Sequence, residues 1–246
     1  MNYRFNKEQH LHQAEVDGEW KNLTGCTTIL SVVSKPALIQ WAANMAINYI
    51  KENAPYVPET KLYMGVNDEI LESARKAHAQ RKTDAGTYGT ETHAQIEKIV
   101  KNAIDHNGGI IGEGTLSPDK SLQNFITWAI TNKVKFLDSE RNIYSEKLWL
   151  GGIVDFICEI DHNVWIGDIK TAGSGIYPEF MWQCAGYHLM LKEMGLYPKV
   201  KGYLILNLKE SGEMLEKRSI SNADNIKAFK ACLDIYRVKE KLNKTI

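Results

Sequence analysis

The segment 151–170 constrains the fold more than any other part of this chain. Two apolar runs, GGIVDFICEI and VWIGDIK, flank a polar turn at residues 161–163. Apolar runs of this length, rich in β-branched residues and separated by turn residues, predict two antiparallel strands. Because side chains alternate along a strand, Asp168 and Lys170 should share one face, while Ile169 points into the opposite layer.

The same hairpin predicts a metal site. A turn of two or three residues places Asp155 opposite residue 168 or 169, where directly opposed side chains lie about 5 Å apart. Two carboxylates in such a pair repel each other unless a cation lies between them, and oxygen ligands suit Mg²⁺ or Mn²⁺. Lys170 could orient water or stabilise a phosphate. Taken alone, these residues also fit a solvent-facing hairpin with an exposed Asp–Lys pair.

Two helical patterns carry further polar residues. GTETHAQIE places His93 and Glu97 on one helix face, and MWQCAGYHLML does the same for Gln183 and Tyr187. Histidine is a frequent metal ligand, and Glu97 could ligate or hold the imidazole, although a surface pair is the alternative. Gln183 and Tyr187 could bond phosphate or sugar oxygens, and Tyr187 could stack on a base.

The rest of the chain predicts an α/β fold of the mixed α+β kind, with a central mixed sheet flanked by helices. A hairpin with a turn at Asp17–Gly18 is expected before residue 33. The expected strands cover 142–171, 200–208 and 213–220, and the expected helices cover 36–53, 67–107 with a break at 86–89, 117–133, 178–195 and 222 onward. No linker composition divides the chain. We therefore expect one domain over 1–246, with 1–83 as a hairpin and helical elaboration and 84–246 as the core.

Composition limits the partners and the compartment. A net charge of +0 counts weakly against nucleic-acid binding, although two basic clusters could still form a local track. These clusters are Arg75, Lys76, Arg81 and Lys82, then Lys199, Lys201, Lys209, Lys217 and Arg218. The opening residues contain no apolar run, and no stretch approaches the roughly 18 apolar residues of a membrane span. We expect a soluble, cytoplasmic protein without membrane contacts, whose scattered cysteines are buried and bind no zinc.

Together these residues resemble the RecB-type nucleases of the PD-(D/E)xK superfamily. The pattern of that family is a helical GxxxH, a strand GxxD, a strand (D/E)xK and a helical QxxxY. This chain has the four motifs in the same order, at Gly89–His93, Gly152–Asp155, Asp168–Lys170 and Gln183–Tyr187. The match covers about residues 84 to 190. SVVSKPALIQWAANMA is also similar to the opening of phage-borne and mitochondrial single-strand exonucleases of this group.

The resemblance implies a restriction-endonuclease-like core with a helical N-terminal elaboration, and a role for each matched residue. One or two Mg²⁺ or Mn²⁺ ions would be bound by His93, Asp155, Asp168 and the carbonyl of Ile169. Lys170 would be catalytic together with Asp155 and Asp168. Gln183 and Tyr187 would shape the site and contact the DNA substrate. Glu97 and Glu146 are secondary candidates.

The implied activity is metal-dependent DNA exonuclease action on single strands or free ends, in replication, recombination or repair, with proteins of those processes as further partners. Helices before residue 130 could arch over the site and offer Arg75, Lys76, Arg81, Lys82 and Tyr88 to the strand. The alternatives are a structure-specific endonuclease with the same site and a non-catalytic nucleic-acid-binding module.

Two cofactors of related enzymes are not expected. Some relatives bind an iron–sulfur cluster through one early and three late cysteines, but Cys232 is the only cysteine after Cys184. The sequence also lacks a Walker A motif, so no nucleotide cofactor is expected.

Overall fold

The computed structural model describes residues 2–6, 8–9, 11–173 and 175–244. Contacts divide the chain into two compact units. One unit comprises Met1–Val33 with Glu91–Ile246, and the other is Ser34–Thr90. The first 33 residues therefore group with the core and not with the elaboration that was expected to run to residue 83. That the whole chain forms one domain stays a prediction.

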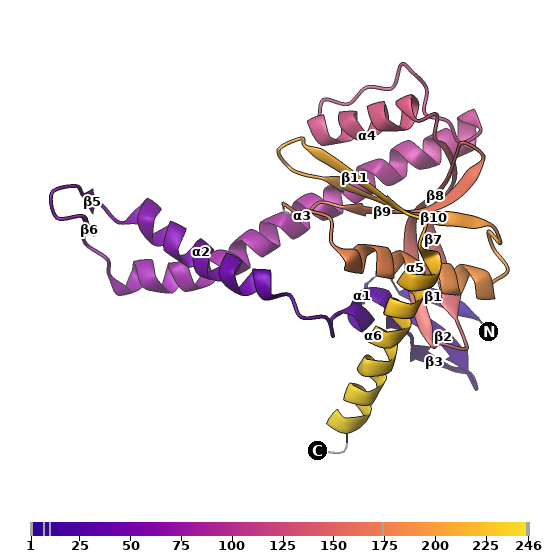
Figure 1. The fold of residues 1–246 in the computed structure, drawn as a ribbon, viewed down its shortest axis with the longest axis horizontal. Helices are drawn as coiled ribbons and strands as arrows, with labels where there is room; N and C mark the ends of the chain where they lie inside the picture. The colour runs from indigo at the N-terminus through magenta and orange to yellow at the C-terminus, as the bar shows by residue number, and fades with distance from the viewer. Residues whose placement is uncertain (1, 7, 10, 174, 245–246) are drawn as a thin grey trace. The chain divides into compact units, whose positions relative to one another are not determined.

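The central sheet of the larger unit is mixed. Within the described part of the chain it has six strands, in the order β11-β10-β9-β8-β4, with β7 also paired to β8 (Figure 1). The strands are β4 (Thr24–Gly25), β7 (Lys135–Ser145), β8 (Leu150–Ile160), β9 (Asn163–Lys170), β10 (Val200–Leu208) and β11 (Met214–Ser219). β9 and β10 pair in parallel, as do β4 and β8, while the other pairs are antiparallel. The predicted fold class, a mixed sheet flanked by helices, is confirmed.

Helices cover both faces of this sheet (Figure 1). One face packs against α4 (Lys120–Thr131) and the part of α3 that follows Thr90, around buried rings such as Phe125 and Phe156. The other face packs against α1, α5 and α6, around Tyr203 and Phe229. Their bounds are Cys26–Leu30, Pro178–Glu193 and Asn222–Asn243. All four cysteines are buried and free, as predicted. None of the described helices has both the length and the apolar character that a membrane span requires.

A small antiparallel sheet precedes the central one, formed by β1 (Tyr3–Asn6), β2 (Leu11–Val16) and β3 (Glu19–Asn22). The predicted turn at Asp17–Gly18 is confirmed, with φ angles of 55° and 80°. His12 of β2 lies so close to β8 that a Cβ at Gly151 would come within 2.3 Å of its side chain. This close approach explains why the first 33 residues belong to the larger unit.

The smaller unit contains α2 (Pro36–Asn53), β5 (Tyr56–Val57), β6 (Leu62–Tyr63) and the beginning of α3 (Asp68–Asn107). The predicted break at 86–89 is wrong, because α3 is continuous through both glycines. A glycine in a helix interior costs only about 1 kcal/mol relative to alanine. The hydroxyl groups of Thr87 and Thr90 also donate to the carbonyls of Thr83 and Gly86, at 3.3 and 3.0 Å.

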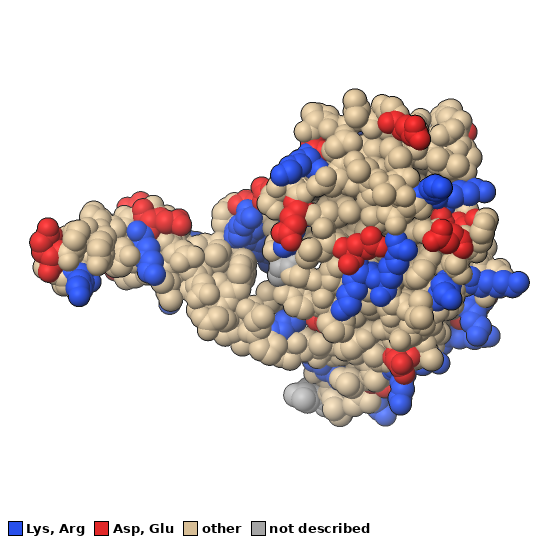
Figure 2. All heavy atoms as spheres, turned by 45° about the horizontal axis from the view of Figure 1, so that its top comes forward, with Lys and Arg blue, Asp and Glu red and all other residues tan. Residues whose placement is uncertain are grey.

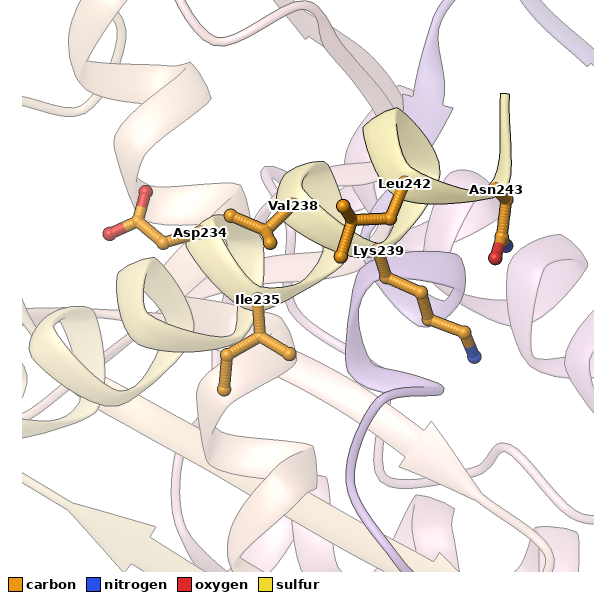
Figure 3. A pocket seen from close by; sticks show the side chains of 6 residues that line it. All are labelled: Asp234, Ile235, Val238, Lys239, Leu242 and Asn243. Atoms are coloured by element: carbon orange, nitrogen blue, oxygen red, sulfur yellow. The ribbon is translucent and has the colours of Figure 1, made fainter. Parts of the chain in front are cut away.

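The last helix, α6, has two apolar sides. Phe229 and Leu233 are buried against the core, whereas Ile235, Val238 and Leu242 are between 57% and 58% exposed. Figure 3 shows these three side chains lining a shallow pocket, together with Asp234, Lys239 and Asn243. The sequence therefore places an apolar strip on the side of α6 that faces away from the sheet.

The hairpin of β8 and β9 closes through a two-residue turn. Ile160 pairs with Asn163, and the intervening Asp161 and His162 have φ angles of 49° and 61°. A type I′ turn requires positive φ at both central residues, which is why Asn-Gly is the favoured pair there. Neither residue of this turn is glycine, so the backbone is strained where the hairpin reverses.

Relieving this strain should stabilise the protein. The double substitution Asp161→Asn and His162→Gly should add about 1 kcal/mol and raise Tm by roughly 2–4 °C, because both new residues tolerate the left-handed backbone. Thermal unfolding followed by circular dichroism measures the change. Asn163→Gly, placed in the extended strand, should instead lower Tm. A double variant that melts at or below the wild type would contradict the assigned strain.

Candidate functional site

The site is built where the pairing of β8 and β9 ends. The last paired residues are Phe156 and Gly167, and the same register places Asp155 opposite Asp168, as predicted. The Ile169 N–H donates to Asp155 Oδ2 at 2.6 Å. The Asp155 carboxylate thus accepts the hydrogen bond that a backbone carbonyl would accept within the sheet. This bond fixes the Asp155 side chain beside β9.

Asp168 is the buried centre of a polar network. It is 1% exposed, and its Oδ2 lies 2.6 Å from Lys170 Nζ. Gln183 Nε2 donates to Asp168 Oδ1 at 3.0 Å and lies 2.6 Å from the Tyr187 hydroxyl, while Gln183 Oε1 accepts from Lys170 Nζ at 3.1 Å. The predicted shared face of Asp168 and Lys170 is confirmed. The single amide of Gln183 orients both of them.

The burial of Gln183 and Tyr187 on α5 bears on the two roles that were expected of them. Gln183 is 7% exposed and Tyr187 is 6% exposed, and their polar atoms are directed at the network. These contacts fit the expected role of both residues in shaping the site, and their predicted contact with DNA stays a prediction. A Cβ at Gly152 would lie 2.9 Å from the Tyr187 ring. Gly152 therefore makes room for the Tyr187 ring.

The charges of the network are set by burial and by mutual proximity. Burial raises the pKa of Asp168 to about 6; the neighbouring Asp155 adds to this rise and Lys170 opposes it. Burial alone would lower the pKa of Lys170, but the carboxylates of Asp168 and Asp155 outweigh it, and the pKa is raised. Lys170 is therefore an ammonium ion at neutral pH.

A second cluster lies next to this network. His93 of α3, Glu140 of β7 and Asp155 of β8 bring one ligand atom each within 4.8 Å of one another. His93 Nδ1 lies 3.7 Å from Asp155 Oδ2. Burial raises the pKa of Glu140 to about 8, and the nearby Asp155 contributes to the rise. The three side chains form a group that could hold a metal ion.

Imidazole and carboxylate donors fit Mn²⁺ well and Mg²⁺ acceptably. The neighbouring carboxylate of Asp168 is oriented differently. Asp168 Oδ2 is buried, and apart from its ion-pair contact with Lys170 it has no hydrogen bond of good geometry among the described residues. Asp168 itself lies outside the three-residue group, because its carboxylate is directed toward Lys170 and Gln183. The predicted set of ligands thus gains Glu140, and direct ligation by Asp168 stays a prediction.

Glu140 is the functional candidate that the sequence prediction missed. The strand β7 begins at Lys135, seven residues before its expected start, and Ser139–Phe156 and Arg141–Val154 are paired. This register places Glu140 opposite Asp155. Its φ is 49°, a left-handed backbone that costs a non-glycine residue on the order of 1–3 kcal/mol. Extending β7 backwards from the turn at 146–149 and counting its pairs with β8 would have placed Glu140 opposite Asp155.

The remaining predicted ligands lie outside the group. Glu97 forms an ion pair with Lys101 on α3. Glu146 follows β7, where its backbone N–H donates to Glu193 Oε1 at 2.9 Å. The Ile169 side chain is buried in the opposite layer, as predicted, and ligation by its carbonyl stays a prediction.

Three residues of the predicted basic clusters form ion pairs with neighbouring glutamates. Arg75 pairs with Glu72, Lys209 with Glu213, and Arg218 with Glu216. Arg75, Lys76, Arg81, Lys82 and Tyr88 all belong to α3 within the smaller unit. On the face shown in Figure 2, basic and acidic residues are interspersed and do not gather in one basic track.

No family model matches the chain, and no curated protein matches it. The crystal structure of SSO0001 is similar over 78% of this chain and 85% of that chain, with 11% sequence identity and a TM-score of 0.34. A likeness this distant carries no argument about function.

Metal binding tests the three-residue group. Mn²⁺ at 100 times its Kd should stabilise the wild type by about 2.7 kcal/mol. Glu140→Gln and Asp155→Asn should each weaken Mn²⁺ binding at least roughly tenfold, because each removes a charged donor. Isothermal titration calorimetry and thermal shift measure both effects. Glu19→Gln, which changes an exposed acid on β3, is the matched control and should bind as the wild type does. An equal loss in the control would refute the group.

The raised pKa of Glu140 should appear as a pH dependence of stability in the absence of metal. The unfolded carboxyl titrates near 4.3, whereas the folded one keeps its proton up to about pH 8. The folded state therefore binds more protons over this interval, and stability falls as pH rises through it. Glu140→Gln, which mimics the protonated acid, should gain Tm over the wild type progressively from pH 5 to pH 9 in EDTA. A difference that does not vary with pH would contradict the burial of this acid.

Proposed function

We propose that this chain hydrolyses phosphodiester bonds in DNA, with a divalent metal ion bound by His93, Glu140 and Asp155. The observation that carries this proposal is the convergence of two groups at one strand end. A cluster of metal-ligand type adjoins a buried carboxylate–lysine pair that Gln183 holds in place. Phosphoryl transfer needs positioned positive charge on both sides of the reacting phosphate, and these two groups would supply it.

Each residue of the site has a separate task in this proposal. A bound Mg²⁺ or Mn²⁺ would polarise the scissile phosphate and activate water. Lys170 stays protonated, so it stabilises negative charge on the phosphoryl oxygens and does not accept a proton. Gln183 and Asp168 fix the direction of its ammonium group. Asp155, held by the Ile169 N–H, keeps its carboxylate at the ligand group.

The substrate class follows from the resemblance to RecB-type nucleases. It supports a stand-alone exonuclease that acts on single strands or free ends in DNA replication, recombination or repair, on a restriction-endonuclease-like core. The net charge of +0 fits an enzyme that binds its strand through local contacts at the site and not through a broad basic surface.

A nuclease assay tests the proposal. The wild type with Mn²⁺ should shorten a linear end-labelled single strand and leave a circular one intact. Asp168→Asn and Lys170→Met should each lower the rate by about 10²–10³-fold, because Lys170→Met removes the cation that stabilises the reacting phosphate and Asp168→Asn removes the carboxylate that holds this cation in place. Lys101→Met, on the exposed part of α3, is the control for loss of a lysine. Cleavage of circles would indicate an endonuclease, and full activity of Asp168→Asn would overturn the proposed chemistry.

A further inference from the structure

An aromatic pair marks the start of α5, close to Lys170. Tyr177 is the residue that precedes the helix, in an extended conformation, and Phe180 lies in the first turn. Their ring centroids are 5.8 Å apart and the rings meet edge to face, at 79°. Phe180 packs against the core, whereas Tyr177 is 39% exposed. The pair therefore has an anchored inner ring and an outer ring open to solvent.

The inner ring touches the proposed catalytic group. Lys170 Nζ lies 5.2 Å from the Phe180 ring centroid, within the range of a cation–π interaction. The same ammonium contacts Asp168 and Gln183 on other sides. A continuous line of contacts thus runs from the buried carboxylate through Lys170 and Phe180 to the exposed ring of Tyr177.

We propose that Tyr177, backed by Phe180, is the stacking platform for an unpaired nucleobase next to the phosphate that Lys170 contacts. This inference rests on the proposed function. Phe180 can cover at most one of the two faces of the Tyr177 ring, and Tyr177 is 39% exposed to solvent. Stacking on an aromatic side chain is worth about 1–3 kcal/mol per base and tolerates any base.

The occupant that fits this position is a base of the strand being cleaved. The platform adjoins the ammonium that would contact the phosphate, and a nucleotide joins a phosphate to a flat ring. Bases within a duplex already stack on their neighbours, so a platform of this kind selects a base that is unpaired. The buried Tyr187, predicted as a stacking residue, cannot offer its ring in this way because it is only 6% exposed.

Abasic substrates test the platform. A fluorescent single strand carries one abasic position, which is moved along the strand, and binding is measured by anisotropy in Ca²⁺ while cleavage is measured in Mn²⁺. For the wild type, one position should lower affinity roughly 5- to 150-fold relative to the intact strand. Tyr177→Ala should bind the intact strand more weakly by a similar factor and lose its sensitivity to that abasic position.

Three variants separate stacking from a general apolar contact. Tyr177→Phe should behave as the wild type, because it keeps the ring. Tyr177→Leu keeps apolar bulk without an aromatic face and should resemble Tyr177→Ala; wild-type behaviour of Tyr177→Leu would overturn stacking. Trp20→Ala removes an exposed ring from β3 and should keep the abasic effect. Circular dichroism confirms that each variant is folded.

The two proposals fail in different ways. If the wild type cleaves DNA and Tyr177→Ala keeps its full abasic sensitivity, the platform is wrong and the proposed function stands. If no abasic position matters to an active wild type, the platform is likewise wrong. A wild type that neither binds nor cleaves DNA overturns both proposals.

Discussion

The site depends on two carboxylates that lie opposite each other on paired strands, because the surrounding residues must compensate their charges. Asp155 and Asp168 lie opposite each other at the point where β8 and β9 cease to pair. Directly opposed side chains have Cβ atoms about 5 Å apart, and two like charges at such a distance would repel each other by on the order of 3 kcal/mol in a partly buried environment. Lys170 compensates Asp168, while the Ile169 N–H and the His93 ring lie close to Asp155. A divalent ion would complete this compensation.

The two helical layers contribute different parts of that compensation. From one layer, α3 brings His93 to Asp155. From the other layer, α5 brings Gln183, whose amide contacts Asp168 and Lys170 at once. The sheet supplies Glu140 through a left-handed residue in β7. A site assembled from both layers depends on the packing of the whole larger unit, because no single segment contains it.

Much of this arrangement could be predicted from the sequence, for reasons of periodicity. Alternation in β9 placed Asp168 and Lys170 on one face, and the turn residues placed Asp155 opposite residue 168 or 169, of which the structure shows Asp168. Glu140 was not predicted because the residues around it in β7 are polar and do not resemble a strand. Its left-handed backbone also interrupts the alternation of side chains by which strands are recognised. The continuity of α3 through Gly86 and Gly89 was missed because local propensity overstates what two glycines cost within a forty-residue helix.

The two-residue turn at Asp161–His162 has a consequence for how this hairpin can change over time. Replacing its strained residues changes stability only modestly, so the amino acids at these two positions can vary. Its length is not free, because a shift of one residue moves every side chain of a strand to the other face. A single inserted residue could turn Asp168 and Lys170 into the apolar layer that now holds Ile169. Natural variation in this loop should therefore consist of substitutions, and not of single insertions or deletions.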